Sequence, residues 1–291
     1  MKKQSRTLST IRSASISLLL TAVILFGSSP CSAFKEWGKI DIYVPKNASP
    51  LEKSIIRVAE SGKPDEALLL TNKAIKTEKN IAGLLLIRIK LYSLLLQEEK
   101  VTADFEKLLK LPLECDQLYH AVDMADSHDE IEVGIQLGQR YIKEFGTAIP
   151  QPTLLTARMY SKLKQYDKAE KLLLLIIGNP IFTDFSYTEL SRVYVYWNKP
   201  EKLIAIATTA LNKPKSFTEK SKIVLRTMRA QAYLETGKYK ETLGDYNILI
   251  AKAPELRELY KLRAKALTGL GQHKLAEADR LKQKELDNLD N

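Results

Sequence analysis

Hydrophobic residues recur with the spacing of amphipathic helices over residues 50–286, and short breaks containing Gly, Asn, Lys or Pro separate the helical segments. Strand-like alternation of apolar and polar residues is scarce and is clearest at Ile40, Ile42 and Val44. The pattern therefore predicts an all-α fold that covers most of the chain. Within residues 50–286, no segment has the long apolar run of a membrane-spanning helix.

The helical segments repeat one another with a period of 34 residues. Three stretches align with matching turns: Ala157–Ile177, Ala230–Pro254 and Ala264–Gln283. Three pairs of residues stand 34 apart in two of them: Ala230 and Ala264, Gly237 and Gly271, and Tyr239 and His273. A fixed period of this length predicts an array of stacked units rather than one bundle.

The repeat resembles the tetratricopeptide repeat, which has small residues at positions 8 and 20 and a large residue at position 11. The resemblance rests on Ala157, Tyr160, Tyr166, Ala169, Ala230, Tyr233, Gly237, Tyr239, Tyr246, Pro254, Ala264, Leu267, Gly271 and Ala276. It implies an all-α, right-handed superhelical solenoid of about seven antiparallel hairpins over residues 50–286, with a tail at 287–291. The alanines at positions 8 and 20 should be buried where helices cross. The frame shifts by five residues at Lys213–Ser221, where we expect a longer loop.

Residues 1–33 have the organisation of a secretory signal peptide. Four cations precede an apolar run of 12 residues, Ile16–Gly27, and a small-residue segment ends at Ala33. Lipidation at Cys31 is the alternative, and Pro30 directly before it argues against that. We therefore expect export as a periplasmic or secreted bacterial protein. Residues 34–49 would be a leader that packs on the first hairpin, lies in the groove or offers a strand edge to a partner.

The net charge of +10 falls to +6 when residues 1–33 are removed, because they hold four Lys or Arg and no acid. Charges of both signs are interspersed along the rest of the chain. Nucleic-acid binding, which requires a clustered basic face, is therefore not expected. The two cysteines exclude a disulfide framework.

The resemblance implies that the first helix of each unit lines a groove that binds a protein or peptide. In the family frame the groove residues are Arg158, Lys162, Phe185, Arg192, Tyr196, Gln231, Lys261 and Lys265. Position 9 reads Arg, Arg, Gln, Lys in four consecutive units, and such a row suits carboxylates or an acidic peptide. The alternative is an ordinary solvated helix face.

Sequence motifs for catalysis are missing, and no catalytic residue, cofactor or metal is predicted. The densest set of potential ligands runs from His120 to Glu132, and His120 and Asp123 stand three residues apart on one helix. Their spacing matches no established metal signature, and acidic residues at a helix turn commonly cap it.

The favoured function is a protein–protein interaction scaffold, adaptor or assembly factor in the bacterial cell envelope. One alternative is a glycan-binding accessory protein in which Tyr196 and Phe185 stack on sugars. A metal-dependent or hydrolytic enzyme is the other alternative. The partner, the pathway and the oligomeric state stay open.

Overall fold

The computed structural model describes residues 47–213 and 216–289, and within these residues fourteen helices, α2–α15, make up the regular structure. The predicted signal peptide and residues 34–46 of the predicted leader lie outside the described residues. The chain divides between Ile176 and Ile177 into two compact units.

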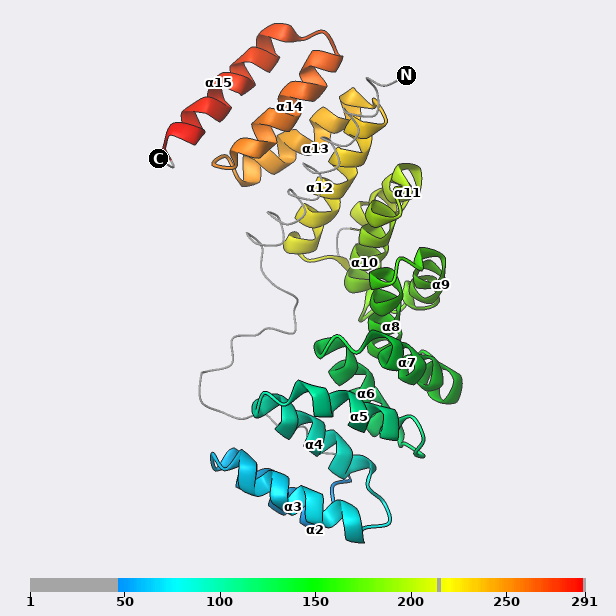
Figure 1. The fold of residues 1–291 in the computed structure, drawn as a ribbon. Helices are drawn as coiled ribbons and strands as arrows, with labels where there is room; N and C mark the ends of the chain where they lie inside the picture. The colour runs from blue at the N-terminus through cyan, green and yellow to red at the C-terminus, as the bar shows by residue number, and fades with distance from the viewer. Residues whose placement is uncertain (1–46, 214–215, 290–291) are drawn as a thin grey trace, which may run out of the picture. The chain divides into compact units, whose positions relative to one another are not determined.

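The N-terminal unit is a stack of four antiparallel hairpins (Figure 1). Its helices are α2 (Pro50–Glu60), α3 (Pro64–Thr77), α4 (Ala82–Leu94), α5 (Glu98–Leu108), α6 (Cys115–Ser127), α7 (Ile131–Phe145), α8 (Gln151–Lys162) and α9 (Tyr166–Ile176). Each helix packs against the next one along the chain. The hairpin α2–α3 forms one end of this stack.

The C-terminal unit continues the same hairpin pattern. Its helices are α10 (Thr183–Tyr196), α11 (Pro200–Leu211), α12 (Glu219–Glu235), α13 (Tyr239–Lys252), α14 (Arg257–Gly269) and α15 (His273–Leu289). The all-helical hairpin repeat that the sequence predicts is confirmed. The last helix reaches Leu289, three residues into the segment predicted as a tail.

A residue with positive φ stands in the turn inside every described hairpin. These residues are Gly62, Leu96, Asp129, Lys164, Asn198, Gly237 and Gly271. Neighbouring ones are 33 to 35 positions apart, except that 39 positions separate Asn198 from Gly237. The left-handed conformation reverses the chain at the end of the first helix and satisfies carbonyls that the helix leaves free.

The turn at Leu96 shows how the hydrogen bonds close. The Leu96 N–H donates to the Ser93 carbonyl at 3.2 Å, and the Gln97 N–H donates to the Tyr92 carbonyl at 2.9 Å. The same pair of bonds recurs around Asp129, Lys164 and Asn198. Glycine adopts this conformation freely, whereas a side chain costs about 1–2 kcal/mol there.

Small residues lie buried at the helix crossings, as the repeat frame predicts. Ala157, Ala169, Ala230 and Ala276 are fully buried, and Ala264 retains only 2% of its surface. The frame shift falls between α11 and α12. The loop predicted at Lys213–Ser221 extends too far at its C-terminal end. Glu219–Ser221 belong to the first turn of α12, because the Thr218 hydroxyl accepts a hydrogen bond from the Ser221 N–H and caps the helix.

Three arginines that the sequence analysis did not single out join neighbouring hairpins. Arg88 on α4 forms a bidentate pair with Asp104 on α5, at 2.6 Å from Nε and 2.7 Å from Nη2. Its third nitrogen, Nη1, donates to the side-chain carbonyl of Asn72 on α3 at 2.8 Å. One guanidinium therefore closes its own hairpin and ties it to the preceding hairpin.

The arrangement recurs at the same frame position twice in the C-terminal unit. Arg229 pairs with Asp245 and reaches Thr208 on α11 at 2.9 Å. Arg263 pairs with Asp279 and reaches Asn247 on α13 at 2.8 Å. We call these three sets the arginine clamps. In each, the arginine and the aspartate are 16 residues apart.

Breaking the first clamp should destabilise the chain strongly. The side chains of Arg88 and Asp104 are only 10% and 2% exposed. Asp104→Ala would leave the guanidinium buried without its counter-charge, and we expect a loss of about 3–5 kcal/mol of unfolding free energy in urea denaturation. The double variant Arg88→Met with Asp104→Leu should recover most of the loss, since it removes both charges.

The control for this test is Lys107→Ala. Lys107 also pairs with Asp104, at 2.8 Å, but its side chain is 54% exposed. Its removal should cost less than about 1 kcal/mol. Equal losses for Asp104→Ala and Lys107→Ala would contradict the role given to the arginine clamp.

Candidate functional site

The first helices of the hairpins line a common face within each unit. In the N-terminal unit α2 contacts α4, α4 contacts α6 and α6 contacts α8, and in the C-terminal unit α10 contacts α12. We call this the first-helix face. The predicted groove residues all lie on first helices: Arg158 and Lys162 on α8, Phe185, Arg192 and Tyr196 on α10, Gln231 on α12, and Lys261 and Lys265 on α14.

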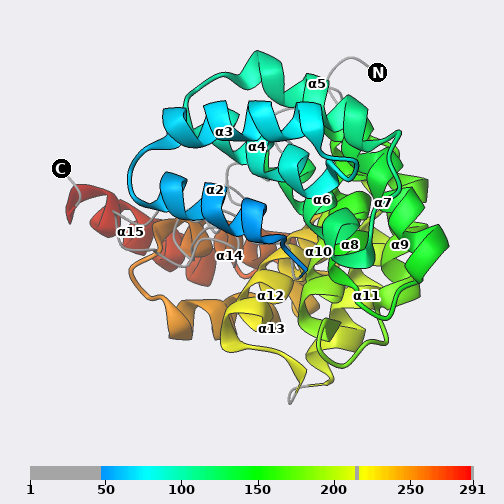
Figure 2. The ribbon, with the colours of Figure 1, turned by 90° about the horizontal axis from the view of Figure 1, so that it is seen from below.

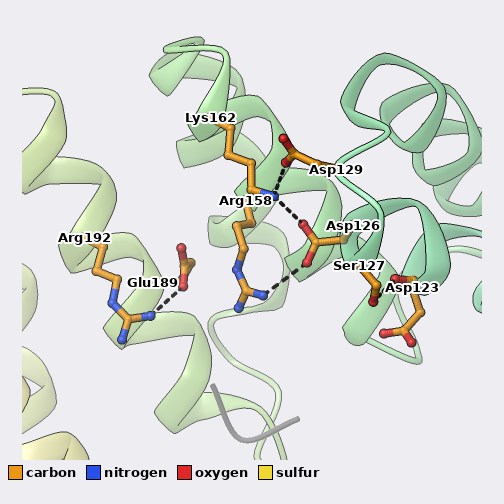
Figure 3. Close-up of polar contacts among 8 residues, drawn as sticks. All are labelled: Asp123, Asp126, Ser127, Asp129, Arg158, Lys162, Glu189 and Arg192. Carbon is orange, nitrogen blue, oxygen red and sulfur yellow. Dashed lines mark hydrogen bonds and ion pairs between the residues drawn. The ribbon is translucent and has the colours of Figure 1, made fainter. Parts of the chain in front are cut away.

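In the N-terminal unit the two predicted cations reach across to the preceding hairpin (Figure 3). Lys162 Nζ lies 3.2 Å from a carboxylate oxygen of Asp126 and 3.0 Å from one of Asp129. Arg158 Nη1 lies 3.4 Å from the other oxygen of Asp126. Asp126 lies in the last turn of α6, and Asp129 is the turn residue with positive φ. The fold of the turn therefore sets the position of both acids.

These acids also change the proton affinity of Lys162. Partial burial acts to lower its pKa, but the hydrogen bonds to Asp129 and Asp126 outweigh burial and raise the pKa above its ordinary value. Lys162 is therefore a fixed cation. Its charge already has two partners within the protein.

In the C-terminal unit the predicted polar residues pair within their own helices. Arg192 Nη1 lies 3.0 Å from Glu189, a carboxylate that is only 7% exposed. Lys261 Nζ lies 3.0 Å from Glu258. The side-chain amide of Gln231 donates to Glu235 at 3.0 Å. Of the cations expected at position 9, Arg158 and Arg192 are therefore already engaged in ion pairs.

Three predicted residues of the C-terminal unit are open to solvent. Phe185 is 40% exposed, Tyr196 is 55% exposed, and Lys265 is exposed as well. The ring of Phe185 lies 5.8 Å from that of Phe182, so the aromatic surface extends beyond the predicted residue. Exposed aromatic side chains can contact a partner without the loss of an ion pair.

The described residues also enclose a polar cavity of about 160 Å³ in the N-terminal unit, with Glu52, Glu78, Glu114 and Asp116 in its lining. Two of these acids cap helices. Glu52 accepts a hydrogen bond from the Ser49 N–H at 2.7 Å at the start of α2, and Glu114 caps α6. Helix capping accounts for their presence there.

No protein-family model matches the sequence, and no curated protein matches it either. Solved structures do match. The C-terminal part of a TPR repeat-containing protein from Cytophaga hutchinsonii is 14% identical, with a TM-score of 0.57 over 81% of this chain and 92% of that chain. YrrB, described as a TPR protein with an unusual peptide-binding site, is 12% identical, with a TM-score of 0.51 over 62% of this chain and 91% of that chain.

The chain has the tetratricopeptide-repeat fold. At these identities the similarity concerns the fold alone. No described helix is both long and apolar enough to cross a membrane.

The third hairpin has a charged residue at position 8 of the tetratricopeptide-repeat frame. Asp123 on α6 occupies position 8, where Ala157, Ala230 and Ala264 pack in other hairpins. Burial raises the pKa of its carboxyl group, and Asp126 adds to the rise, while His120 and Arg158 oppose it. A charged carboxylate at this partly buried position loses hydration, and this loss costs free energy of folding.

His120 lies one turn before Asp123 on α6. Its Nε2 lies 3.7 Å from Asp116, and its ring lies 4.9 Å from that of Tyr119. Burial lowers the pKa of His120, although Asp116 and Asp123 act in the opposite direction. Among the residues that the structure describes, no three His, Cys, Asp or Glu side chains come together to hold a metal ion.

Replacing Asp123 by its neutral isostere should stabilise the protein at neutral pH. Because the folded state raises the pKa of this acid, the folded chain holds the proton more tightly than the unfolded chain, and stability falls as pH rises through that range. Asp123→Asn should therefore unfold at higher urea concentration than the parent at pH 7. The difference should shrink as pH drops below the ordinary carboxyl pKa.

Glu106→Gln is the matched control, because Glu106 is exposed on α5. It should show little of this pH-dependent difference. Lower stability of Asp123→Asn than of the parent at pH 7 would mean that the carboxylate makes a favourable contact in the folded state.

Proposed function

We propose that this chain is a non-catalytic protein–protein interaction scaffold or assembly factor of the bacterial cell envelope. It captures a segment of a partner protein on the first-helix face. The observation that carries the proposal is the exposed aromatic and cationic surface of this face in the C-terminal unit, at Phe185, Tyr196 and Lys265.

The fold supports this role because stacked hairpins present an extended face made of many helices. Such a face suits an extended or helical segment better than a small molecule, which needs an enclosed pocket. YrrB, which shares the fold, is described as having a peptide-binding site. The signal-like organisation of residues 1–33 supports the envelope as the place of action.

The ion pairs on the face refine the kind of partner that we propose. An acidic segment would meet Lys265 directly, but at Arg192 it would compete with Glu189. The net gain from such an exchange is small, whereas the exposed rings gain contact area without any exchange. We therefore propose a segment that places apolar side chains on Phe185 and Tyr196 and a carboxylate on Lys265.

Glycan binding is a second candidate, and the exposure of Tyr196 is the observation in its favour. Sugar rings would stack on Tyr196 and Phe185, with neighbouring polar groups binding the hydroxyls. Competition separates the two candidates. A soluble cell-wall glycan that releases captured material would favour this one.

Partner capture should depend on the exposed residues of the first-helix face. Chemical crosslinking in the source cell, with the full chain as bait, should recover a protein that is reduced several-fold with Tyr196→Ala or Lys265→Glu. Lys265→Glu is preferred to reversal at Arg192, because a glutamate at 192 would face the buried Glu189 and harm the fold. Quantitative mass spectrometry of the crosslinked material gives the readout.

Lys274→Glu is the matched control for this experiment. Lys274 is exposed on α15, a second helix. The same charge reversal at that position should leave capture unchanged. Equal capture by all baits would place the binding site elsewhere, and capture of no protein would turn attention to glycans.

Export predicts a defined end for the mature chain. Protein recovered from the envelope fraction should begin at Phe34, because the signal pattern ends at Ala33. N-terminal sequencing measures this directly. A chain that still begins at Met1 and fractionates with the cytoplasm would contradict the proposed location, and a lipid-modified Cys31 would replace release by anchoring.

A further inference from the structure

The first hairpin of the stack exposes a face that is more deeply buried in the later hairpins of the same unit. This leading face is formed by frame positions 4 and 7 on the first helix and position 23 on the second helix. In later hairpins the preceding hairpin covers it, as when Asn72 on α3 reaches Arg88 at position 7 of its unit. Figure 2 looks onto α2 and α3 from this end of the N-terminal unit.

Exposure at equivalent positions measures the difference. At position 4, Leu51 is 38% exposed, whereas Leu85 and Thr153 are fully buried. At position 23, Leu70 is 38% exposed, whereas Asp104 is 1% exposed. Ser54 at position 7 is exposed too.

The chemistry of this face is apolar, unlike that of the opposite end of the repeat. On α15 the positions that would meet a following hairpin hold Arg280, Gln283 and Lys284. Their equivalents on α13 are Tyr246, Leu249 and Ile250, which pack into a core. Terminal hairpins of repeat proteins need a polar outer face or a cover. The last described hairpin has the polar face, and the first one lacks it.

We propose that residues 34–46 are the cover of this leading face. They directly precede Asn47, the first described residue, and their sequence FKEWGKIDIYVPK supplies Phe34, Trp37, Ile40, Ile42, Tyr43 and Val44 as apolar groups. Thirteen residues reach roughly 40 Å when extended. A helix as long as α3 spans only about 20 Å, so the segment is long enough to cross the hairpin.

This role of the leader is independent of any partner. The leader replaces the missing preceding hairpin and removes Leu51 and Leu70 from water. An uncovered patch of this kind favours association with other chains. The leader would therefore keep the N-terminal end of the stack from associating with other proteins and leave the first-helix face free for its partner.

Trp37 provides a direct reporter, because Trp197 is the other tryptophan of the chain. In the Trp197→Phe background, emission from Trp37 should be blue-shifted and shielded from acrylamide. The double change Leu51→Lys and Leu70→Lys should shift the emission to the red and increase acrylamide quenching several-fold. Leu275→Lys is the control, because Leu275 is 57% exposed on α15 and lies off the leading face.

If the lysine variants unfold, a crosslink between cysteine variants provides a second test. With Cys31→Ser and Cys115→Ser, a short bismaleimide should join Ile42→Cys to Leu70→Cys within one chain, and should not join Ile42→Cys to Leu275→Cys. Solvent-exposed Trp37 in the parent, or a shielded Trp37 that ignores Leu51→Lys and Leu70→Lys, would overturn the proposal. So would a dimer that Leu70→Lys dissociates without moving Trp37 emission, since a second copy would then be the cover.

Discussion

Every hairpin of this chain depends on its neighbour to cover side chains that it cannot bury alone. Arg88 makes this dependence plain, because its charge is tolerated in the interior only with Asp104 of its own hairpin and Asn72 of the preceding hairpin at hydrogen-bond distance. The same constraint explains why Leu85 is fully buried while Leu51, its equivalent in the first hairpin, is not. Stability in such an array is carried by nearest-neighbour interfaces. A loss at one clamp therefore weakens two hairpins together.

The period of the repeat could be predicted from the sequence because it rests on residues whose identity the geometry restricts. A small residue at positions 8 and 20 is needed where helices cross, and Ala157 and Ala169 are accordingly buried. The turn residues were less predictable. Gly237 indicates a left-handed turn, but Leu96 and Lys164 adopt the same conformation although their residue types do not favour it. In those hairpins the packing of the flanking helices overrides the local preference.

The candidate site was predictable in its residues but not in its electrostatics. A repeat frame states which residues of one helix share a face, so Arg158 and Lys162 could be placed on α8. Their partners Asp126 and Asp129 lie in the preceding hairpin, at a distance along the chain that no helix periodicity encodes. The arginine clamps were missed for a similar reason. Their signal, an arginine followed 16 residues later by an aspartate in three units, becomes visible only when frame positions are compared between hairpins.

The paired state of the cations bears on how a partner could gain affinity on the first-helix face. A carboxylate that approaches Arg192 must compete with Glu189 for the guanidinium, so attraction and loss partly cancel. Phe185 and Tyr196 impose no such cost, because the area they offer is already in contact with water. Affinity on this face would therefore come mainly from apolar contacts at the rings. The ion pairs would orient the segment and reject wrongly charged ones, since a misplaced charge would face a like charge at close range.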